Sequence, residues 1–145
     1  MRRRLALTLC LVSFSSSTWA CEPNLEDASM KRYLQKATAD TVVFAARVVS
    51  IEEHKEHGVL VQTAQLRTSR WWRGKQMPEV LVIGEKGRGA GTSCFGVFDF
   101  VMKEGEEWLI VGQMKDGKIS PAKFLSQLMS EKEAKTKSLS DLSKF

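Results

Sequence analysis

The segment TVVFAARVVSI, residues 41–51, decides the fold of this chain. It is rich in β-branched residues, which favour strands. Two apolar sets alternate along it: one is Phe44, Ala46 and Val48, and the other is Val43, Ala45, Val49 and Ile51. Because successive side chains of a strand point to opposite faces, this pattern predicts a long strand that is buried on much of both faces.

Further segments alternate in the same way, at 59–72, 79–84, 94–102 and 106–114. The turn residues Arg73-Gly74-Lys75 and the break at Pro78 separate the first two of these segments. Lys103-Glu104-Gly105 predicts a tight hairpin between the last two. Five strands in succession favour a small β-barrel or sandwich over an α/β fold.

Helical spacing appears on both sides of the predicted strands. Residues 24–37 carry apolar side chains at that spacing, at Met30, Tyr33, Leu34 and Ala37. After the strands, Ser120 followed by Pro121 predicts a helix start. The apolar face of that helix would be formed by Phe124, Leu125, Leu128 and Met129. Residues 131–145 are polar and predict a helical or disordered tail. The predicted architecture is therefore mainly β, with an N-terminal and a C-terminal helix.

Residues 1–20 have the pattern of a secretory signal peptide. A positively charged start, Arg2-Arg3-Arg4, is followed by an apolar run of about ten residues and by small residues near the end. The run is shorter than the roughly 20 residues that a membrane-spanning helix needs. A cut between Ala20 and Cys21 fits the small residues best. We therefore expect one domain, residues 21–130, that begins at Cys21 and is secreted to an extracellular or periplasmic space.

Export would remove most of the positive charge. Residues 1–20 hold three arginines and no acidic residue, so 19 basic side chains remain against 17 acidic ones. The formal net charge falls from +5 to +2. The high pI of the whole chain therefore gives little support to nucleic-acid binding.

The cysteines lead to a further expectation. Cys10 leaves with the signal peptide, while Cys21 and Cys94 remain. Two cysteines in an oxidising compartment predict one disulfide. The alternatives are an intermolecular bond, a free thiol or a lipid anchor on Cys21. Thr18 and Trp19 fit a lipoprotein signal poorly, and this disfavours the lipid.

Two segments suggest a ligand and also have a simpler structural explanation. The Gly-rich run at 84–93 lacks the Gly-Lys-Ser/Thr and the following helix of a phosphate loop, so it predicts a flexible connection between strands. His54 and His57 have no convincing third metal ligand nearby in the sequence, so a solvated, charged loop explains them better.

The segment RTSRWWRGK, residues 67–75, combines cations with Trp71 and Trp72, as in proteins that stack bases or sugars. The simpler interpretation is that one tryptophan packs in the core while its neighbour covers the barrel rim. Glu104, Glu106 and Glu107 stand beside a turn and are expected to be solvated. No activated nucleophile or acid–base pair is recognisable, so we do not expect an enzyme.

Several of these features together resemble the netrin-like domains, whose best-known members are the tissue inhibitors of metalloproteinases. They are the start at Cys21 and the segments ADTVVFAARVVSIEE (39–53), WWRGK (71–75) and SCFGVFDFVMKEGEEWLIVG (93–112). The resemblance covers about residues 21–128. It implies an OB-like five-stranded Greek-key barrel with flanking helices.

The resemblance also implies a site. In these inhibitors the terminal cysteine is bridged to a cysteine before the fourth strand, which corresponds here to Cys21 and Cys94. The free α-amine and carbonyl of Cys21 would chelate the zinc of a target protease, in the position that a catalytic zinc keeps open. The residues in contact with the protease would be Cys21, Glu22, Pro23, Asn24, Gly91, Thr92 and Ser93.

Two other functions stay open. The chain could be a periplasmic or surface protein-interaction module without inhibitory activity, in which the bridge ties the first helix to the barrel. It could also be an OB-type module that binds sugar or nucleic acid through Trp71 and Trp72. On the leading interpretation the partner is a protein, a zinc metalloprotease. The chain itself is then a monomer with no cofactor and no transmembrane segment.

Overall fold

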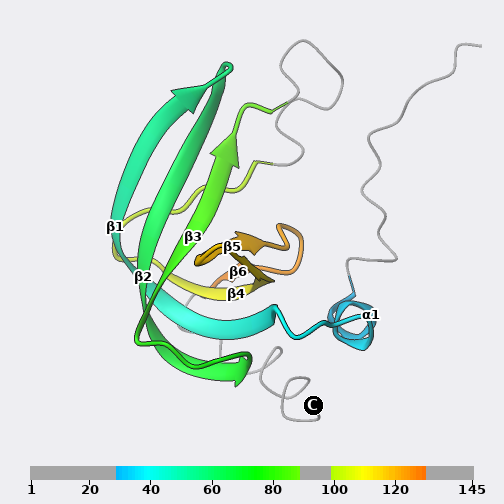
Figure 1. The fold of residues 1–145 in the computed structure, drawn as a ribbon. Helices are drawn as coiled ribbons and strands as arrows, with labels where there is room; N and C mark the ends of the chain where they lie inside the picture. Colours follow the sequence, from blue (N-terminus) through cyan, green and yellow to red (C-terminus); the bar gives the residue numbers. More distant parts are fainter. Residues whose placement is uncertain (1–28, 89–98, 130–145) are drawn as a thin grey trace, which may run out of the picture.

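The computed structural model describes residues 29–88 and 99–129, and this part of the chain is mostly β-strand (Figure 1). One short helix, α1, precedes the strands at Met30–Gln35. The strands are β1 (Thr41–Glu56), β2 (Val59–Arg73), β3 (Glu79–Lys86), β4 (Glu107–Lys115), β5 (Lys118–Pro121) and β6 (Gln127–Leu128). The expectation of a mainly β fold is confirmed.

The strands form one sheet that closes on itself. Their order is β1-β2-β3-β5-β4-β6, and β1 also pairs with β4, so the first five strands make a closed barrel. β3 and β5 are parallel and meet at only two residue pairs, Leu81 with Lys118 and Val82 with Ile119. The other pairings between strands are antiparallel. The predicted five-stranded barrel is therefore present, and β6 extends the sheet beside β4.

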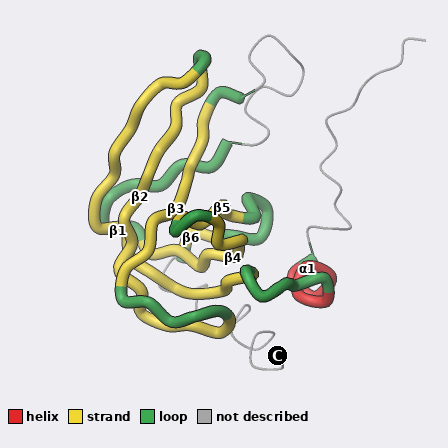
Figure 2. The backbone as a smooth tube through the Cα atoms, in the orientation of Figure 1, coloured by secondary structure: helices red, strands yellow, loops and turns green. Residues whose placement is uncertain are grey.

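The strand β1 is long because it serves two parts of the molecule. Residues 41–47 pair with β4 on one edge, while the pairing with β2 continues to Glu56. Irregularities in the register with β2, the last between Val48 and Ser50, bend the strand as bulges do. Beyond the bend, β1 and β2 continue as a curved arm, visible at the top of Figure 2, in which residues 60–67 of β2 also pair with β3. The arm turns at His57 and Gly58, whose φ angles of 49° and 81° suit a tight hairpin turn.

Two apolar clusters lie on opposite faces of β1. The inner core fills the barrel and contains Val42, Phe44, Ala46 and Val48, each at most 3% exposed. The outer core lies outside the barrel and contains Val43, Leu109, Val111 and Leu125. Met30, Tyr33 and Leu34 of α1 pack against the outer core. Burial of β1 on both faces is thus confirmed for residues 41–46, while Val49 is 42% exposed.

The predicted strand at 94–102 is not found in its described part, residues 99–102. Phe100 makes a single bridge to Glu85 of β3, and residues 99–102 do not pair with β4. The turn at 103–105 is therefore no hairpin between two strands. Instead, the Gly105 N–H donates to the Val48 carbonyl at 2.9 Å. The alternation of apolar residues was misleading because Phe100 and Met102 enter the inner core without forming a strand.

The predicted C-terminal helix is also wrong. Ser120 and Pro121 belong to β5 and pair with Gln113 and Gly112 of β4. A short turn then brings Leu125 into the outer core before β6. The edge of β4 offers backbone partners that a helix could not use, and this outweighs the local helix signal. At the other end of the chain, α1 lies within the helix predicted at 24–37. Residues 24–28 and the predicted tail at 131–145 lie outside the described residues.

Candidate functional site

The residues predicted to contact a protease all lie outside the described part of the chain. Cys21, Glu22, Pro23 and Asn24 precede it, and Gly91, Thr92, Ser93 and Cys94 fall in the gap at 89–98. The structure does, however, describe the elements that flank both of these segments. It shows how the chain is held from residue 29 onwards and on both sides of the gap at 89–98.

The helix α1 follows the first segment and is fixed to the outside of the barrel. Its apolar face packs against the outer core, where Leu109 and Val111 of β4 are 1% and 0% exposed. The Tyr33 hydroxyl accepts a hydrogen bond from Gln113 Nε2 at 3.2 Å. Helix α1 is therefore held against β1 and β4.

The second segment begins and ends at neighbouring points. The Gly87 N–H donates to Asp99 Oδ1 at 2.8 Å. One step further in, Glu85 and Phe100 exchange two backbone hydrogen bonds, each of 2.8 Å. Gly84 permits this close approach, because a Cβ there would lie 2.6 Å from the Phe100 carbonyl oxygen. The residues on either side of 89–98 are thus held together at the end of β3.

Charged side chains reinforce the same place. The Arg88 guanidinium binds Glu85 with two hydrogen bonds, of 2.9 and 2.7 Å. Lys123 Nζ lies 3.2 Å from Glu85 Oε2. Hydrogen bonding from Arg88, and then from Lys123, lowers the pKa of Glu85 although partial burial opposes this shift. Lys123 comes from the turn after β5, so Glu85 joins this turn to the end of β3.

The two tryptophans of β2 lie in different environments. Trp71 stacks on Phe44 of the inner core, with ring centroids 4.6 Å apart, and its indole N–H donates to the Met77 carbonyl at 3.3 Å. Trp72 packs against the outer core, and the Arg70 guanidinium carbon lies 4.9 Å from the centre of its ring. Both tryptophans therefore have a structural role. The simpler interpretation of the sequence placed one of them in the core and the other at the barrel rim.

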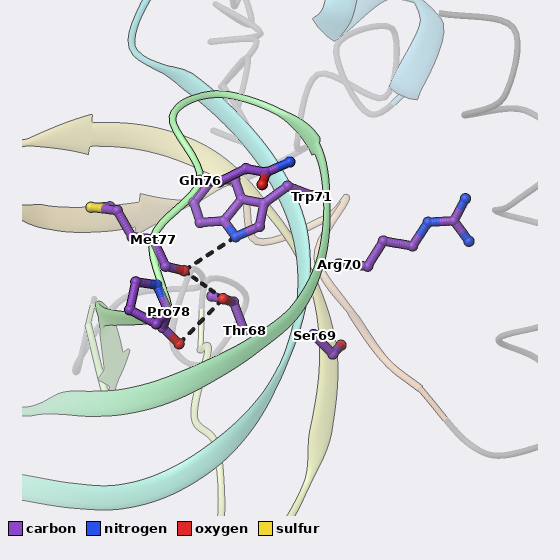
Figure 3. A pocket seen from close by; sticks show the side chains of 7 residues that line it. All are labelled: Thr68, Ser69, Arg70, Trp71, Gln76, Met77 and Pro78. Atoms are coloured by element: carbon purple, nitrogen blue, oxygen red, sulfur yellow. Dashed lines mark hydrogen bonds between the residues drawn. The ribbon is translucent and has the colours of Figure 1, made fainter.

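A surface pocket of about 510 Å³ lies between the end of β2 and the loop to β3 (Figure 3). Its lining residues are Thr68, Ser69, Arg70, Trp71, Gln76, Met77 and Pro78. The Thr68 hydroxyl donates to the Met77 carbonyl, which closes the loop against the strand. Sequence reasoning recognised the tryptophans and cations of β2. It missed Gln76, which becomes a neighbour of Trp71 only when the loop folds back.

A second pocket, of about 500 Å³, lies where the arm leaves the barrel. Ile51, Leu60 and Met102 contribute apolar surface there. Gln62 is 4% exposed at this place, and its amide hydrogen-bonds to Glu53 and to the backbone of Met102. The Gln62 amide thus holds Met102 against the barrel, which gives this buried polar side chain a structural role.

The remaining candidates are the two histidines and the carboxylates next to the turn at 103–105. His54 and His57 lie on the arm, each with a weak contact to Glu56, at 3.9 and 3.8 Å. Glu107 pairs with Arg47 at 2.7 Å, and Glu106 accepts the Trp108 indole N–H at 3.0 Å. Two of the carboxylates that were predicted to be solvated therefore have structural partners. Within residues 29–88 and 99–129 no three His, Cys, Asp or Glu side chains are grouped to hold a metal ion.

Comparison with known proteins leaves the class defined by the fold alone. No protein-family model, no curated protein and no solved structure matches this chain. In the described part of the chain, no helix is long and apolar enough to cross a membrane. The chain is therefore defined as a closed five-stranded β-barrel with an additional outer core.

Proposed function

We propose that the chain is an exported, netrin-like binding module of OB-like topology that inhibits a zinc metalloprotease. The α-amine and carbonyl of Cys21 would take the open coordination position of the protease zinc. The strand order, in which β1 pairs with β4 and β3 runs parallel to β5, supports the OB-like part of this proposal.

One contact carries the proposal furthest, the ion pair between Lys123 and Glu85 at 3.2 Å. Lys123 follows Ala122, which packs against the same outer core as α1. Glu85 belongs to the base of the run at 89–98. Helix α1 and the residues that flank 89–98 are therefore supported by neighbouring contacts. A disulfide between Cys21 and Cys94 would complete that support and pre-order a binding edge, which reduces the entropy lost on binding.

The test is an inhibition assay with the exported protein. Its intact mass, before and after reduction, establishes whether it starts at an unmodified Cys21 and lacks two hydrogens. An alanine added before Cys21 moves the amine away from the zinc and should abolish inhibition. The control is Glu52→Ala, a substitution of an exposed residue of β1. It should inhibit normally.

Inhibition that survives the added alanine would exclude the zinc mechanism. The absence of inhibition against zinc endopeptidases with both apolar and cationic pockets would favour the interaction module instead. Glu22 makes the choice of proteases matter. The inhibitors that the chain resembles carry a small uncharged residue there, and a carboxylate is costly to bury without a cationic partner. Glu22→Ala should therefore shift inhibition towards proteases with apolar pockets.

A further inference from the structure

Cations are concentrated at one end of the barrel. Residues 29–40 and 68–78 contain a single acidic residue, Asp40, against Lys31, Arg32, Lys36, Arg70, Arg73 and Lys75. The two segments meet in the structure. Trp72 packs against the same outer core as α1, and Arg73 Nη2 lies 3.4 Å from the Thr38 carbonyl oxygen. This end of the molecule therefore carries a net positive charge, although the formal net charge of residues 21–145 is only +2.

Arg70 differs from Arg47 of β1 and from Arg67 of its own strand. Arg47 is paired with Glu107 at 2.7 Å, and Arg67 is paired with Glu79 at 3.6 Å. Among the described residues, Arg70 has no acidic partner and rests on the Trp72 ring. A guanidinium on an aromatic face keeps its N–H donors available at its edge. Arg70 is thus positioned by Trp72 and able to bind an anion.

The pocket beside it carries the groups that bind hydroxyls. The hydroxyls of Thr68 and Ser69 donate to the carbonyls of Met77 and Ala45, so their oxygens remain acceptors. The Gln76 amide has no hydrogen-bond partner within the described residues. Figure 3 shows Gln76 next to the Trp71 ring. The Arg70 side chain extends from β2 in the opposite direction to that of Trp71. A ligand that reaches both sides must cross the end of β2, so it is an oligomer.

The aromatic residues decide between kinds of polyanion. A single-stranded nucleic acid stacks its bases on free aromatic faces, and a membrane surface takes up free tryptophan side chains. Trp71 is stacked on Phe44, and Trp72 is packed against the outer core and covered by Arg70. These rings are already engaged. Hydroxyl acceptors, a free amide and the Arg70 guanidinium instead suit a hydroxylated chain with anionic substituents.

We propose that the end of β2 and the loop to β3 bind an anionic oligosaccharide. Its sugar hydroxyls would be bound by Thr68, Ser69 and Gln76 beside the edge of Trp71. Its carboxylate or sulfate groups would be bound by Arg70, with Arg73 and Lys75 contributing charge. This site is independent of Cys21, so it can be present whether or not the chain inhibits a protease.

The experiment measures binding of the full exported chain to oligogalacturonate, to sulfated dextran oligomers and to neutral dextran oligomers of equal length. We expect binding to at least one anionic oligomer, with neutral dextran weaker by at least about tenfold. Arg70→Gln and Gln76→Ala should each weaken that binding by about tenfold, the effect of losing one strong hydrogen bond. The control Arg47→Gln, which alters an ion pair elsewhere on β1, should change it by less than about twofold. The carboxylate and sulfate probes distinguish the kind of anionic group.

Two results would overturn the proposal. One is no binding to either anionic oligomer by a protein with a normal unfolding transition. The other is binding that depends on Arg70 but not on Gln76 and is matched by oligothymidylate or by vesicles of phosphatidylglycerol and phosphatidylcholine. That second result would describe a general cationic surface without a saccharide pocket.

Discussion

Gln62 holds the backbone of Met102 by both of its polar groups. The Gln62 Nε2 donates to the Met102 carbonyl at 3.3 Å, and the Gln62 Oε1 accepts the Met102 N–H at 2.9 Å. The amide thus replaces a neighbouring strand for residues 100–102, which have little ladder pairing of their own. Met102 is 1% exposed, so these backbone groups have no water to replace a lost partner.

Replacing Gln62 with Ala should therefore lower the free energy of unfolding by about 2–4 kcal/mol, because two buried backbone groups lose their partner. Urea unfolding followed by tryptophan fluorescence measures this change. Gln65→Ala is the control: that side chain bonds to Glu79 at 2.8 Å on the exposed face of β2. Equal effects of the two substitutions would mean that Gln62 does not hold residues 100–102.

The outer core should contribute to stability as a true core. Val43 is 0% exposed on the outer face of β1, whereas Val49 of the same strand is 42% exposed. We expect Val43→Ala to cost about 2 kcal/mol and Val49→Ala less than about 0.5 kcal/mol. Thermal or urea unfolding of the pair provides the comparison. A small effect at Val43 would show that α1 and the C-terminal turn pack loosely on the barrel.

A second pair of substitutions separates the observed C-terminal turn from the helix that the sequence predicts. On that helix Leu125 and Leu128 would share one apolar face. In the structure they are 5% and 49% exposed. Leu125→Ala should cost about 2–4 kcal/mol and Leu128→Ala less than about 1 kcal/mol, as measured by chemical unfolding. Similar costs at the two positions would argue for the helix.

The Glu85 cluster should make part of the stability sensitive to acid. Because its pKa is lowered in the folded chain, ionised Glu85 contributes stability that is fully present above its ordinary value of 4.5. That contribution is lost as the pH falls through the lowered pKa. Glu85→Gln should therefore be less stable than the wild type at pH 7, with a difference that shrinks in acid.

Chemical unfolding at a series of pH values measures this difference. Glu52→Gln, on the exposed arm, removes one negative charge without touching Arg88 or Lys123 and is the matched control. A difference between wild type and Glu85→Gln that stays constant from neutral to acid pH would contradict the assignment. It would mean that the charge of Glu85 does not support the base of the run at 89–98.

The part of the fold that could be predicted is the part in which local pattern and tertiary structure agree. Residues 41–51 alternate two apolar sets because they face two cores, and β2 and β3 follow from alternation and turn residues. The helix predicted from Ser120-Pro121 was wrong because backbone pairing with β4 is a long-range effect that no local signal reports. The strand predicted around Phe100 was wrong for a different reason: an apolar side chain can enter a core from a segment without strand pairing.

For the site, the sequence predicts the types of residue involved and their order along the chain, and not their arrangement in space. The residues named for it lie outside the described part, and their mapping rests on resemblance. The pocket beside Trp71 was partly foreseen from the cations and tryptophans of residues 67–75. Gln76 was missed because its relation to the strand is created by the loop, whose closure depends on hydrogen bonds from Thr68 and Trp71.

The parallel contact between β3 and β5 has a consequence for how the protein is made. Until residue 121 has been synthesised, β1, β2 and β3 can form only an open sheet, because β4 covers the free edge of β1 and β5 that of β3. Such a sheet exposes two unpaired edges and the apolar residues of the barrel interior, which makes it prone to aggregate. The chain is therefore most vulnerable in the interval when most of it exists and its last strands have yet to emerge.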